Sequence, residues 1–280
     1  MTTTTTTLSR GSPTRLAAFG RATRRLAVAY LPALCLIALL VTGWEAWVRV
    51  FDTRPYVLPA PSRIWTAFLE VRETLPNHIR TTVGEALLGL GIAAVVGVVL
   101  AAAIALIPLV RRVVYPLVVV TQSVPLAVLA PLLIVWFGFG TGPKVMVVAL
   151  TGFFPIVVST VDGLMHGDRD MADLARSMGA RRLTVMRYVL IPAALPSFFA
   201  GLKIASAYAV FGAIVGEWVG AREGLGIFIT RAQASYRADR VFVGVVIVAL
   251  VSMLLFATVH LIARLATPWM YVQQQEEDSR

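Results

Sequence analysis

Several polar residues of this sequence lie inside long apolar stretches, where they could serve the passage of a solute rather than a reaction. Glu217 stands near the end of the stretch 195–219. A charged group at such a position is costly to bury and is by default functional, although an ion pair with Arg222 would explain it equally well. The uncharged hydrogen-bonding residues in similar surroundings are Gln122, Ser123, Ser206 and Tyr208. All five residues are candidates for the wall of a path through which a polar solute moves.

Residues suited to catalysis or metal binding are scarce. The chain has one cysteine, Cys35, and three scattered histidines, which excludes a disulfide framework and argues against a metal site. The sequence contains no phosphate loop of the G-x-x-x-x-G-K-S/T type, no Ser/His/Asp arrangement and no paired carboxylates. The chain alone is therefore expected to be non-catalytic, with neither a metal nor a cofactor of its own.

The composition places these residues in a membrane. Hydrophobic residues make up 58% of the chain, charged residues only 14%, and the mean hydropathy is +0.79. A soluble domain has about half apolar and about a quarter charged residues, so a cytosolic enzyme and a disordered chain are both excluded. The net charge of +10 is explained by arginines held at membrane surfaces, and we expect no nucleic-acid partner.

Six apolar stretches are long enough to cross a membrane, which takes about 20 helical residues for about 30 Å of hydrocarbon. They are 26–50, 83–107, 113–137, 144–161, 195–219 and 241–265. The sequence thus predicts an all-α polytopic membrane protein with a transmembrane domain over 26–268. We expect a disordered Thr/Arg-rich leader (1–25) before it and a tail (269–280) after it. Five arginines in the leader favour a cytoplasmic amino terminus, and six spans return the carboxyl terminus to the same side.

The second stretch has small residues at every fourth position, a pattern that lets a neighbouring helix approach closely. Its members are Gly89, Ala93, Gly97 and Ala101, followed by Ala105. The alternative is that alanine and glycine are simply common in membrane helices. We interpret the stripe as a helix-packing surface.

The third stretch contains Pro125 and Pro131. Proline removes a backbone donor, so we expect the helix to kink or split at 122–125. Backbone carbonyls freed at membrane depth are tolerated only where they face protein or a water-filled cavity. The segment with Gln122, Ser123 and Pro125 is therefore either a wall of the translocation path or an inert kink packed on a neighbour.

A short helix over 63–71 is expected between the first two stretches, outside the hydrocarbon. The turn-rich run 58–62 precedes it, and Ser62 is suited to cap its first turn. This helix would lie along the outer membrane surface. Its apolar face consists of Ile64, Ala67, Phe68 and Val71.

The longest cytoplasmic loop, 162–194, predicts another short helix over 170–178. Asp168 or Asp170 can cap its first turn, and Gly179 can end it in a left-handed conformation. A helix of two or three turns is not stable alone in water, so we expect a partner to dock on it. One side of the helix would present Met171, Leu174, Ala175 and Met178.

The spacing within this loop resembles the EAA loop (Glu-Ala-Ala-x3-Gly-x9-Ile-x-Leu-Pro) of ATP-binding-cassette (ABC) importer permeases. The matching positions are Asp173, Leu174, Ala175, Gly179, Val189, Ile191 and Pro192. Four of these depart from the motif but keep its charge or apolar character, whereas the glycine and the proline are retained. Further segments look like landmarks of the nitrate/sulfonate/taurine branch, namely 58–62, 136–140, 153–156, 192–196 and 224–226.

The resemblance implies a type I ABC importer-like permease in the lipid of a bacterial plasma membrane, with a cytoplasmic coupling helix. Two copies of such a permease assemble with two ATPase subunits, which bind ATP and Mg, and a substrate-binding protein docks outside. Gly179 and Pro192 would fix the bends on either side of the coupling segment. The ATPase contact would be made by Asp170, Met171, Asp173, Leu174, Ala175 and Met178.

The same resemblance leaves the solute open. The branch covers nitrate, taurine and alkylsulfonates, and it also looks like permeases for pyrimidine-type vitamin precursors. The last outer loop has arginines that would draw anions or contact acidic residues of the binding protein, namely Arg222, Arg231, Arg237 and Arg240. We expect an oxyanion, with a pyrimidine-type precursor as the alternative and with the binding protein setting most of the selectivity. An ATP-independent secondary carrier would instead predict internal repeats and paired ionisable residues inside spans, which the sequence does not show clearly.

Overall fold

The computed structural model describes residues 15–167 and 169–269, and every element in these ranges is helical. The predicted all-α class is confirmed. α1 begins within the range predicted for the leader, whose first 14 residues lie outside the described residues, as do 270–280 of the tail. In chain order the elements are α1 (Arg15–Val50), α2 (Pro61–Val71), α3 (Leu75–Leu106), α4 (Pro108–Thr121), α5 (Leu126–Phe137), α6 (Thr141–His166), α7 (Arg169–Ser177), α8 (Arg182–Val185), the π-helical turn η1 (Met186–Leu190), α9 (Ile191–Glu217), α10 (Leu225–Ala234) and α11 (Ala238–Ala266).

Five stretches are each long and apolar enough to cross a membrane: α1 from Leu31, α3, α6, the run from Leu183 to the end of α9, and α11. α4 and α5 supply a sixth crossing when they are counted together, although the chain bends by 102° between them. The structure thus has five candidate spans, or six when α4 and α5 are counted as one. Among the described residues, 15–63 with α1 form one compact unit, and those from Ile64 onward form a second unit, the helical bundle described below.

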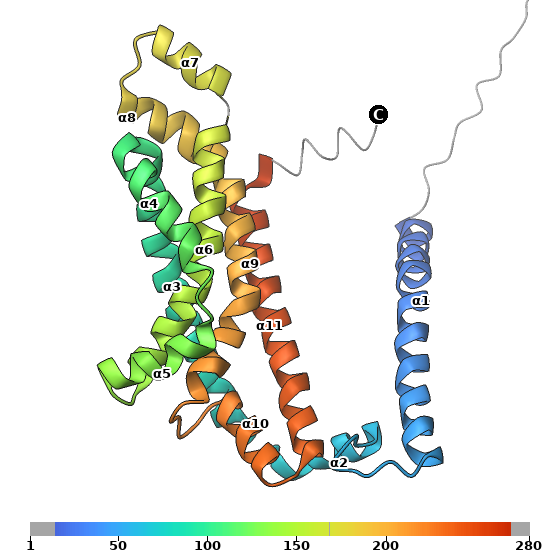
Figure 1. Ribbon diagram of the computed structural model, residues 1–280. Coiled ribbons are helices and arrows are strands. Elements are labelled where there is room, and N and C mark those ends of the chain that lie inside the picture. Colours follow the sequence, from blue (N-terminus) through green and yellow to red (C-terminus); the bar gives the residue numbers. More distant parts are fainter. Residues whose placement is uncertain (1–14, 168, 270–280) are drawn as a thin grey trace, which may run out of the picture. The chain divides into compact units, whose positions relative to one another are not determined.

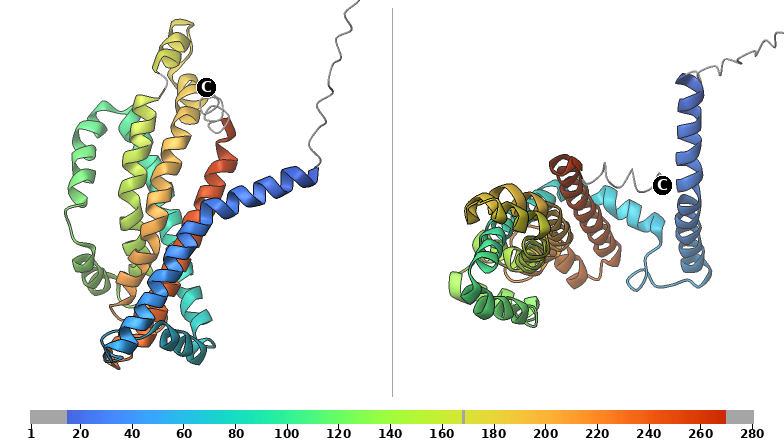
Figure 2. Two further views of the ribbon diagram at one scale, coloured as in Figure 1. Left: turned by 90° about the vertical axis from the view of Figure 1, so that its right-hand side faces the viewer. Right: turned by 90° about the horizontal axis from the view of Figure 1, so that it is seen from above.

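The centre of the bundle is the pair α6 and α9, which run side by side (Figures 1 and 2). α3 packs on both helices, and α11 packs on α9. Ala205, Ala209 and Ala213 of α9 are fully buried in one cluster with Val148 of α6 and Leu90 of α3. Because alanine side chains are short, the three helix backbones can approach closely.

The small-residue stripe predicted on α3 faces α6. All four of its predicted members are buried: Gly89, Ala93, Gly97 and Ala101. A Cβ atom built on Gly97 would lie 2.8 Å from Cγ2 of Ile156, and one built on Gly89 would lie 2.8 Å from the carbonyl oxygen of Val145. Both distances are shorter than real carbon contacts, so the approach of α3 to α6 requires glycine at these two positions.

We expect a Gly89→Ala variant to lower the free energy of unfolding in detergent by about 1–3 kcal/mol, the usual effect of overpacking. The added Cβ would press on the Val145 carbonyl, a backbone atom that cannot turn aside. Gly91 lies on the exposed side of the same helix with nothing within 4 Å, so Gly91→Ala is the matched control. Thermal unfolding of the purified variants compares them, and equal midpoints would contradict this packing.

The predicted break at 122–125 is confirmed, since it separates α4 from α5 and turns the chain by 102°. Pro125 immediately precedes α5 and has no N–H to donate, so the helical hydrogen-bond ladder cannot continue through it. The chain turns instead, with the Ser123 N–H donating to the Val120 carbonyl at 2.9 Å. α5 consequently runs at a steep angle to α4 (Figure 1).

α2 buries the apolar face predicted for it, and Ala67 and Val71 cluster with residues of α10 and α11. The helix begins at Pro61, earlier than predicted, because proline fits the first position of a helix. The predicted cap is therefore wrong: Ser62 lies inside the helix. Its N–H and its hydroxyl donate to the Glu45 carboxylate at 3.0 and 2.7 Å.

Candidate functional site

α7 lies at one end of the bundle, opposite the end where α2 and α10 are found (Figures 1 and 2). Much of its predicted apolar side is exposed, with exposed fractions of 51% for Met171, 56% for Leu174 and 80% for Met178. Ala175 is half-buried, and Ala172 on the other side is buried, where α7 contacts α8 and η1. The buried side of α7 thus packs on α8 and η1, and its other side exposes apolar residues.

Gly179 follows α7 in the left-handed conformation that the sequence predicted, with φ of +84°. The backbone bonds form a Schellman motif. The Gly179 N–H donates to the Arg176 carbonyl at 2.9 Å, and the Ala180 N–H donates to the Ala175 carbonyl at 3.0 Å. A residue with a Cβ would be strained here by roughly 1–2 kcal/mol, so glycine sets the angle at which the chain leaves α7.

The acidic residues of α7 are exposed. Asp170 sits in the first turn, where its charge favours the positive end of the helix. Asp173 pairs with Arg176 at 2.7 Å, but both side chains face water, so the pair contributes little to stability. The other candidate cap, Asp168, lies outside the described residues. The fold therefore depends little on these carboxylates, which leaves them open to a partner.

Pro192 lies within a continuous run of helical turns. The chain stays helical from α8 through η1 into α9, and Pro192 lies in the first turn of α9. The preceding turn is π-helical, with the Ile191 N–H donating to the Met186 carbonyl five residues earlier. The wider turn accommodates the proline, which has no N–H for the ordinary helical bond. The coupling segment therefore turns at Gly179 and is joined to α9 by helical turns rather than by a loop.

A cleft of about 570 Å³ opens beside the α4–α5 break. Two of the predicted path residues, Gln122 and Tyr208, line it. Phe154 and Phe211 also line it, and sequence reasoning missed them because single aromatic residues in an apolar helix look like core. The remaining lining residues are Leu126, Thr151, Pro155, Val158, Ser159 and Ile204.

Among the described residues, the lining of this cleft has no charged side chain. Thr151 donates its hydroxyl proton to the Val147 carbonyl at 2.7 Å. Within the part of the chain that the structure describes, the side chains of Gln122, Ser159 and Tyr208 have no hydrogen-bond partner. The cleft therefore combines aromatic surface with a few free polar groups, which is the usual make-up of a small-molecule site.

The other predicted path residues lie elsewhere. Ser206 is fully buried, and its hydroxyl donates to the Lys203 carbonyl at 2.8 Å, so its place in the path is not supported. Residues two positions apart on a helix point roughly 200° apart, which is why Ser206 cannot share the cleft with Tyr208. Ser123 and Pro125 are exposed at the break but do not line the cleft.

Glu217 is fully buried at the end of α9 and joins α3 to α10. Its carboxylate accepts the Thr82 hydroxyl proton at 2.6 Å and the Gly226 N–H at 2.5 Å. Thr82 in turn accepts the Leu225 N–H at 2.8 Å. A carboxylate at a helix N-terminus is stabilised by the helix dipole, so Glu217 fixes α10 in place. The alternative ion pair with Arg222 does not occur among the described residues.

A buried ion pair was not predicted from the sequence. Lys144 of α6 and Glu85 of α3 form an ion pair of 2.8 Å, with exposed fractions of only 9% and 2%. Lys144 is the first residue of the predicted span 144–161. The available signal was two opposite charges among the first residues of the second and fourth predicted spans, which start on the same side of the membrane. Together with Glu217, this pair ties α3, α6, α9 and α10 together.

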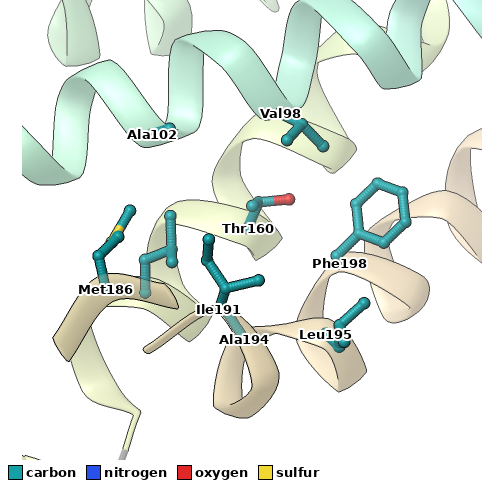
Figure 3. A pocket seen from close by; sticks show the side chains of 9 residues that line it. Val98, Ala102, Thr160, Met186, Ile191, Ala194, Leu195 and Phe198 are labelled. Carbon is teal, nitrogen blue, oxygen red and sulfur yellow. The ribbon is translucent and has the colours of Figure 1, made fainter. Parts of the chain in front are cut away.

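A separate cavity of about 240 Å³ lies between α3, α6, η1 and α9 (Figure 3). Its lining is almost wholly apolar and includes Val98, Met186 and Phe198. Thr160 lies in its wall, but its hydroxyl donates to the Ile156 carbonyl at 2.6 Å. This cavity has little to offer a polar solute, so the cleft beside the α4–α5 break is the better candidate for the path.

Charged residues gather where α2 meets the start of α11. Arg237 bonds Glu70 at 2.8 Å and Asp239 at 2.9 Å, and Arg240 bonds Glu70 at 3.2 Å. Hydrogen bonds from Arg237 and Arg240 lower the pKa of Glu70, and those to Asp239 and Glu70 raise the pKa of Arg237. Two of the four arginines expected to attract anions are thus already paired within the chain.

The chain is similar to known transport proteins. Residues 93–270 match the family described as binding-protein-dependent transport system inner membrane component. The formylaminopyrimidine transport permease protein ThiX of Halalkalibacterium halodurans is 37% identical over 239 residues, which cover 85% of this chain and 95% of that protein. The riboflavin transport system permease protein RibX of Chloroflexus aurantiacus is 32% identical, covering 85% and 91%. The taurine transport system permease protein TauC of Escherichia coli is 28% identical, covering 83% and 87%.

A solved structure shares the fold. It is the MetNI methionine ABC transporter in an inward-facing conformation, with a TM-score of 0.63 and 21% identity. The alignment covers 71% of this chain and 98% of that chain. At this level of identity the likeness concerns the arrangement of the helices, which is that of a type I importer permease.

Proposed function

The chain belongs to the family of binding-protein-dependent transport system inner membrane components and is a permease subunit of an ABC importer, and from this premise we propose that α7 is its coupling helix. The observation that supports this most is the exposed apolar face of Met171, Leu174 and Met178. Gly179 holds this face at a defined angle. Exposed apolar surface on so short a helix is typical of a docking site for another protein.

In the proposed assembly, two copies of the chain pair in the bacterial plasma membrane with their termini in the cytoplasm. Two ATPase subunits bind ATP and Mg and receive α7 in a groove, while the permease itself is non-catalytic. ATP binding draws the ATPase subunits together and moves the two α7 helices, and hydrolysis resets them. The helical connection from α8 through η1 into α9 supports this mechanism, because it joins the segment after α7 to a spanning helix without a loop.

An extracytoplasmic binding protein would deliver the solute at the opposite end of the bundle, near α2 and α10. The buried bonds of Glu217 and the Glu85–Lys144 pair support this arrangement. The Glu217 bonds fix α10 at the end of α9, and the ion pair joins α3 to α6, so a docking protein would contact helices in fixed positions.

The solute that we propose is a pyrimidine-type vitamin precursor. The formylaminopyrimidine permease is 37% identical to this chain, against 28% for the taurine permease. The arginines that favoured an oxyanion are partly engaged, since Arg237 and Arg240 are bonded to Glu70. Arg222 and Arg231 remain exposed and keep an oxyanion as the second candidate.

Purification of the tagged chain from its native membrane in mild detergent, with companions identified by mass spectrometry, tests the assembly. We expect a stoichiometric ATPase together with an extracytoplasmic binding protein. Repeated recovery of the chain alone, even after cross-linking, would favour a secondary carrier and would remove the basis for assigning α7 as a coupling helix.

For a Leu174→Asp variant, we expect the amount of ATPase recovered with the tagged chain to fall by at least about tenfold. The reason is that a charge then replaces an apolar contact at the proposed interface. Tyr236→Asp is the matched control, since Tyr236 is 82% exposed in the short connection between α10 and α11. Aspartate also tolerates the positive φ of 56° at that position. Retention of the ATPase by Leu174→Asp would place the contact elsewhere.

A further inference from the structure

We propose that the cleft beside the α4–α5 break is a binding site for an uncharged heteroaromatic ring on its way through the membrane. The permease would then select its solute a second time, after the binding protein has done so. The inference rests on the proposed importer function and assigns a solute site to this chain's own residues.

Four elements line the cleft, namely the end of α4, the start of α5, α6 and α9, and the last two each turn one continuous face toward it. The break leaves Gln122 at the end of α4 rather than inside a helix. Positions three, four, seven and eight residues apart share one side of a helix. α6 follows this spacing with Thr151, Phe154, Pro155, Val158 and Ser159. α9 follows it with Ile204, Tyr208 and Phe211.

The aromatic side chains in the cleft are suited to stack on a flat ring. Tyr208 and Phe211 have exposed fractions of 55% and 50%, although neighbouring positions of α9 are completely buried. Phe154 faces the same cleft from α6. Stacking of a heteroaromatic base on one aromatic side chain changes affinity by roughly 5- to 160-fold in other proteins. The cleft has three such side chains.

The polar groups in the cleft suit a ring that carries both donors and acceptors. The Gln122 amide can donate and accept at the same time, and the hydroxyls of Ser159 and Tyr208 can do either. None of the three has a hydrogen-bond partner in the ranges that the structure describes. An uncharged nitrogen heterocycle can satisfy all three without bringing a charge into the membrane.

The same lining is unfavourable for an anion. No lysine or arginine is found among the described residues that line the cleft. A sulfonate or nitrate would lose its water there and gain no opposite charge, which is a large penalty. The volume of about 570 Å³ falls within the range of about 300–1,000 Å³ that is usual for small-molecule sites.

The test uses the whole complex of permease, ATPase and loaded binding protein in proteoliposomes, and measures uptake of a tritiated aminopyrimidine together with ATP hydrolysis. Phe211→Leu removes one ring, and Gln122→Met removes the amide at similar size. Phe211→Leu is expected to lower uptake by about tenfold, the effect of one lost stack. Gln122→Met is expected to lower uptake by a similar factor, the effect of the lost amide hydrogen bonds. The stimulation of ATP hydrolysis by the loaded binding protein should stay within about twofold of wild type, because neither residue belongs to α7.

Phe198→Leu is the matched control, since it makes the same change on the same helix but in the apolar cavity of Figure 3. It should leave uptake at the wild-type level. Wild-type uptake by Phe211→Leu and Gln122→Met would overturn the site but not the importer. An equal loss in Phe198→Leu would also count against the site, because it would trace the effect to a weakened α9. A wild-type complex that hydrolyses ATP without accumulating the aminopyrimidine would overturn the substrate, and the ring site with it.

Discussion

A Gly179→Val variant is expected to insert and fold but to lose ATP-driven uptake by about tenfold or more. Gly179 has φ of +84°, where a residue with a Cβ is strained by roughly 1–2 kcal/mol, and a β-branched one is disfavoured further. Nothing lies within 4 Å of the position of a new Cβ, so the strain is confined to the backbone. The chain can relieve it by leaving α7 at another angle, which would misplace the coupling face relative to α9.

Uptake into proteoliposomes measures this effect, and the amount of assembled complex in the membrane checks insertion. Gly179→Asn is the matched control, because asparagine tolerates the left-handed conformation and should keep most of the uptake. Normal transport by Gly179→Val would mean that the exit angle of α7 is unimportant.

A Lys144→Met variant is expected to lose about 3–5 kcal/mol of stability, the usual result of removing one partner from a buried ion pair. Glu85 is only 2% exposed, and its Oε2 has no hydrogen-bond partner among the described residues. Lys144 therefore supplies the compensating charge for this carboxylate, at 2.8 Å. Without it, α3 and α6 would enclose an unpaired carboxylate. Thermal unfolding in detergent, followed by the loss of helical signal, measures the change.

Two further variants test whether the loss of stability comes from the unpaired buried carboxylate. The double variant Lys144→Met with Glu85→Met should recover most of the stability, because replacing a whole buried pair by apolar groups is often neutral. Arg176→Ala, which breaks the exposed pair with Asp173, should change stability by only about 0–1 kcal/mol. A Lys144→Met protein as stable as the wild type would show that Glu85 has another source of compensation.

Features set by a single residue's backbone chemistry were predictable from the sequence. Gly179 predicts a left-handed helix end and Pro125 predicts a break, and both are found because these residues act on the chain next to them. Pro192 shows the limit of this reasoning. A π-helical turn accommodates it, and whether a helix widens or bends depends on what packs around it.

Features set by contacts between helices were not predictable. The periodic stripe shows that α3 has a packing face, but not that Gly89 meets Val145 of α6. Likewise, the order of residues along the chain does not reveal that Thr82 and Gly226 share the Glu217 carboxylate. Thr82 lies 135 positions before Glu217 in the chain, so only the folded bundle brings these two residues together.

The candidate cleft was predictable in part. Gln122 and Tyr208 stand out as polar residues in apolar stretches, and both line it. Ser206 stands out equally but is buried, because its hydroxyl can bond to the backbone of its own helix. Nothing in the sequence indicates that Phe154 and Phe211 line a cleft, since an aromatic residue facing a cleft and one in a core have the same sequence pattern.

ATP hydrolysis by the reconstituted complex, with and without the loaded binding protein, tests the central claim most directly. The account predicts that the loaded binding protein stimulates hydrolysis and that the aminopyrimidine accumulates only when ATP is supplied. It also predicts that Gly179→Val separates these two activities, so that hydrolysis continues while accumulation stops. Accumulation driven by an ion gradient in the absence of ATP would contradict the claim that this chain is a permease coupled through α7.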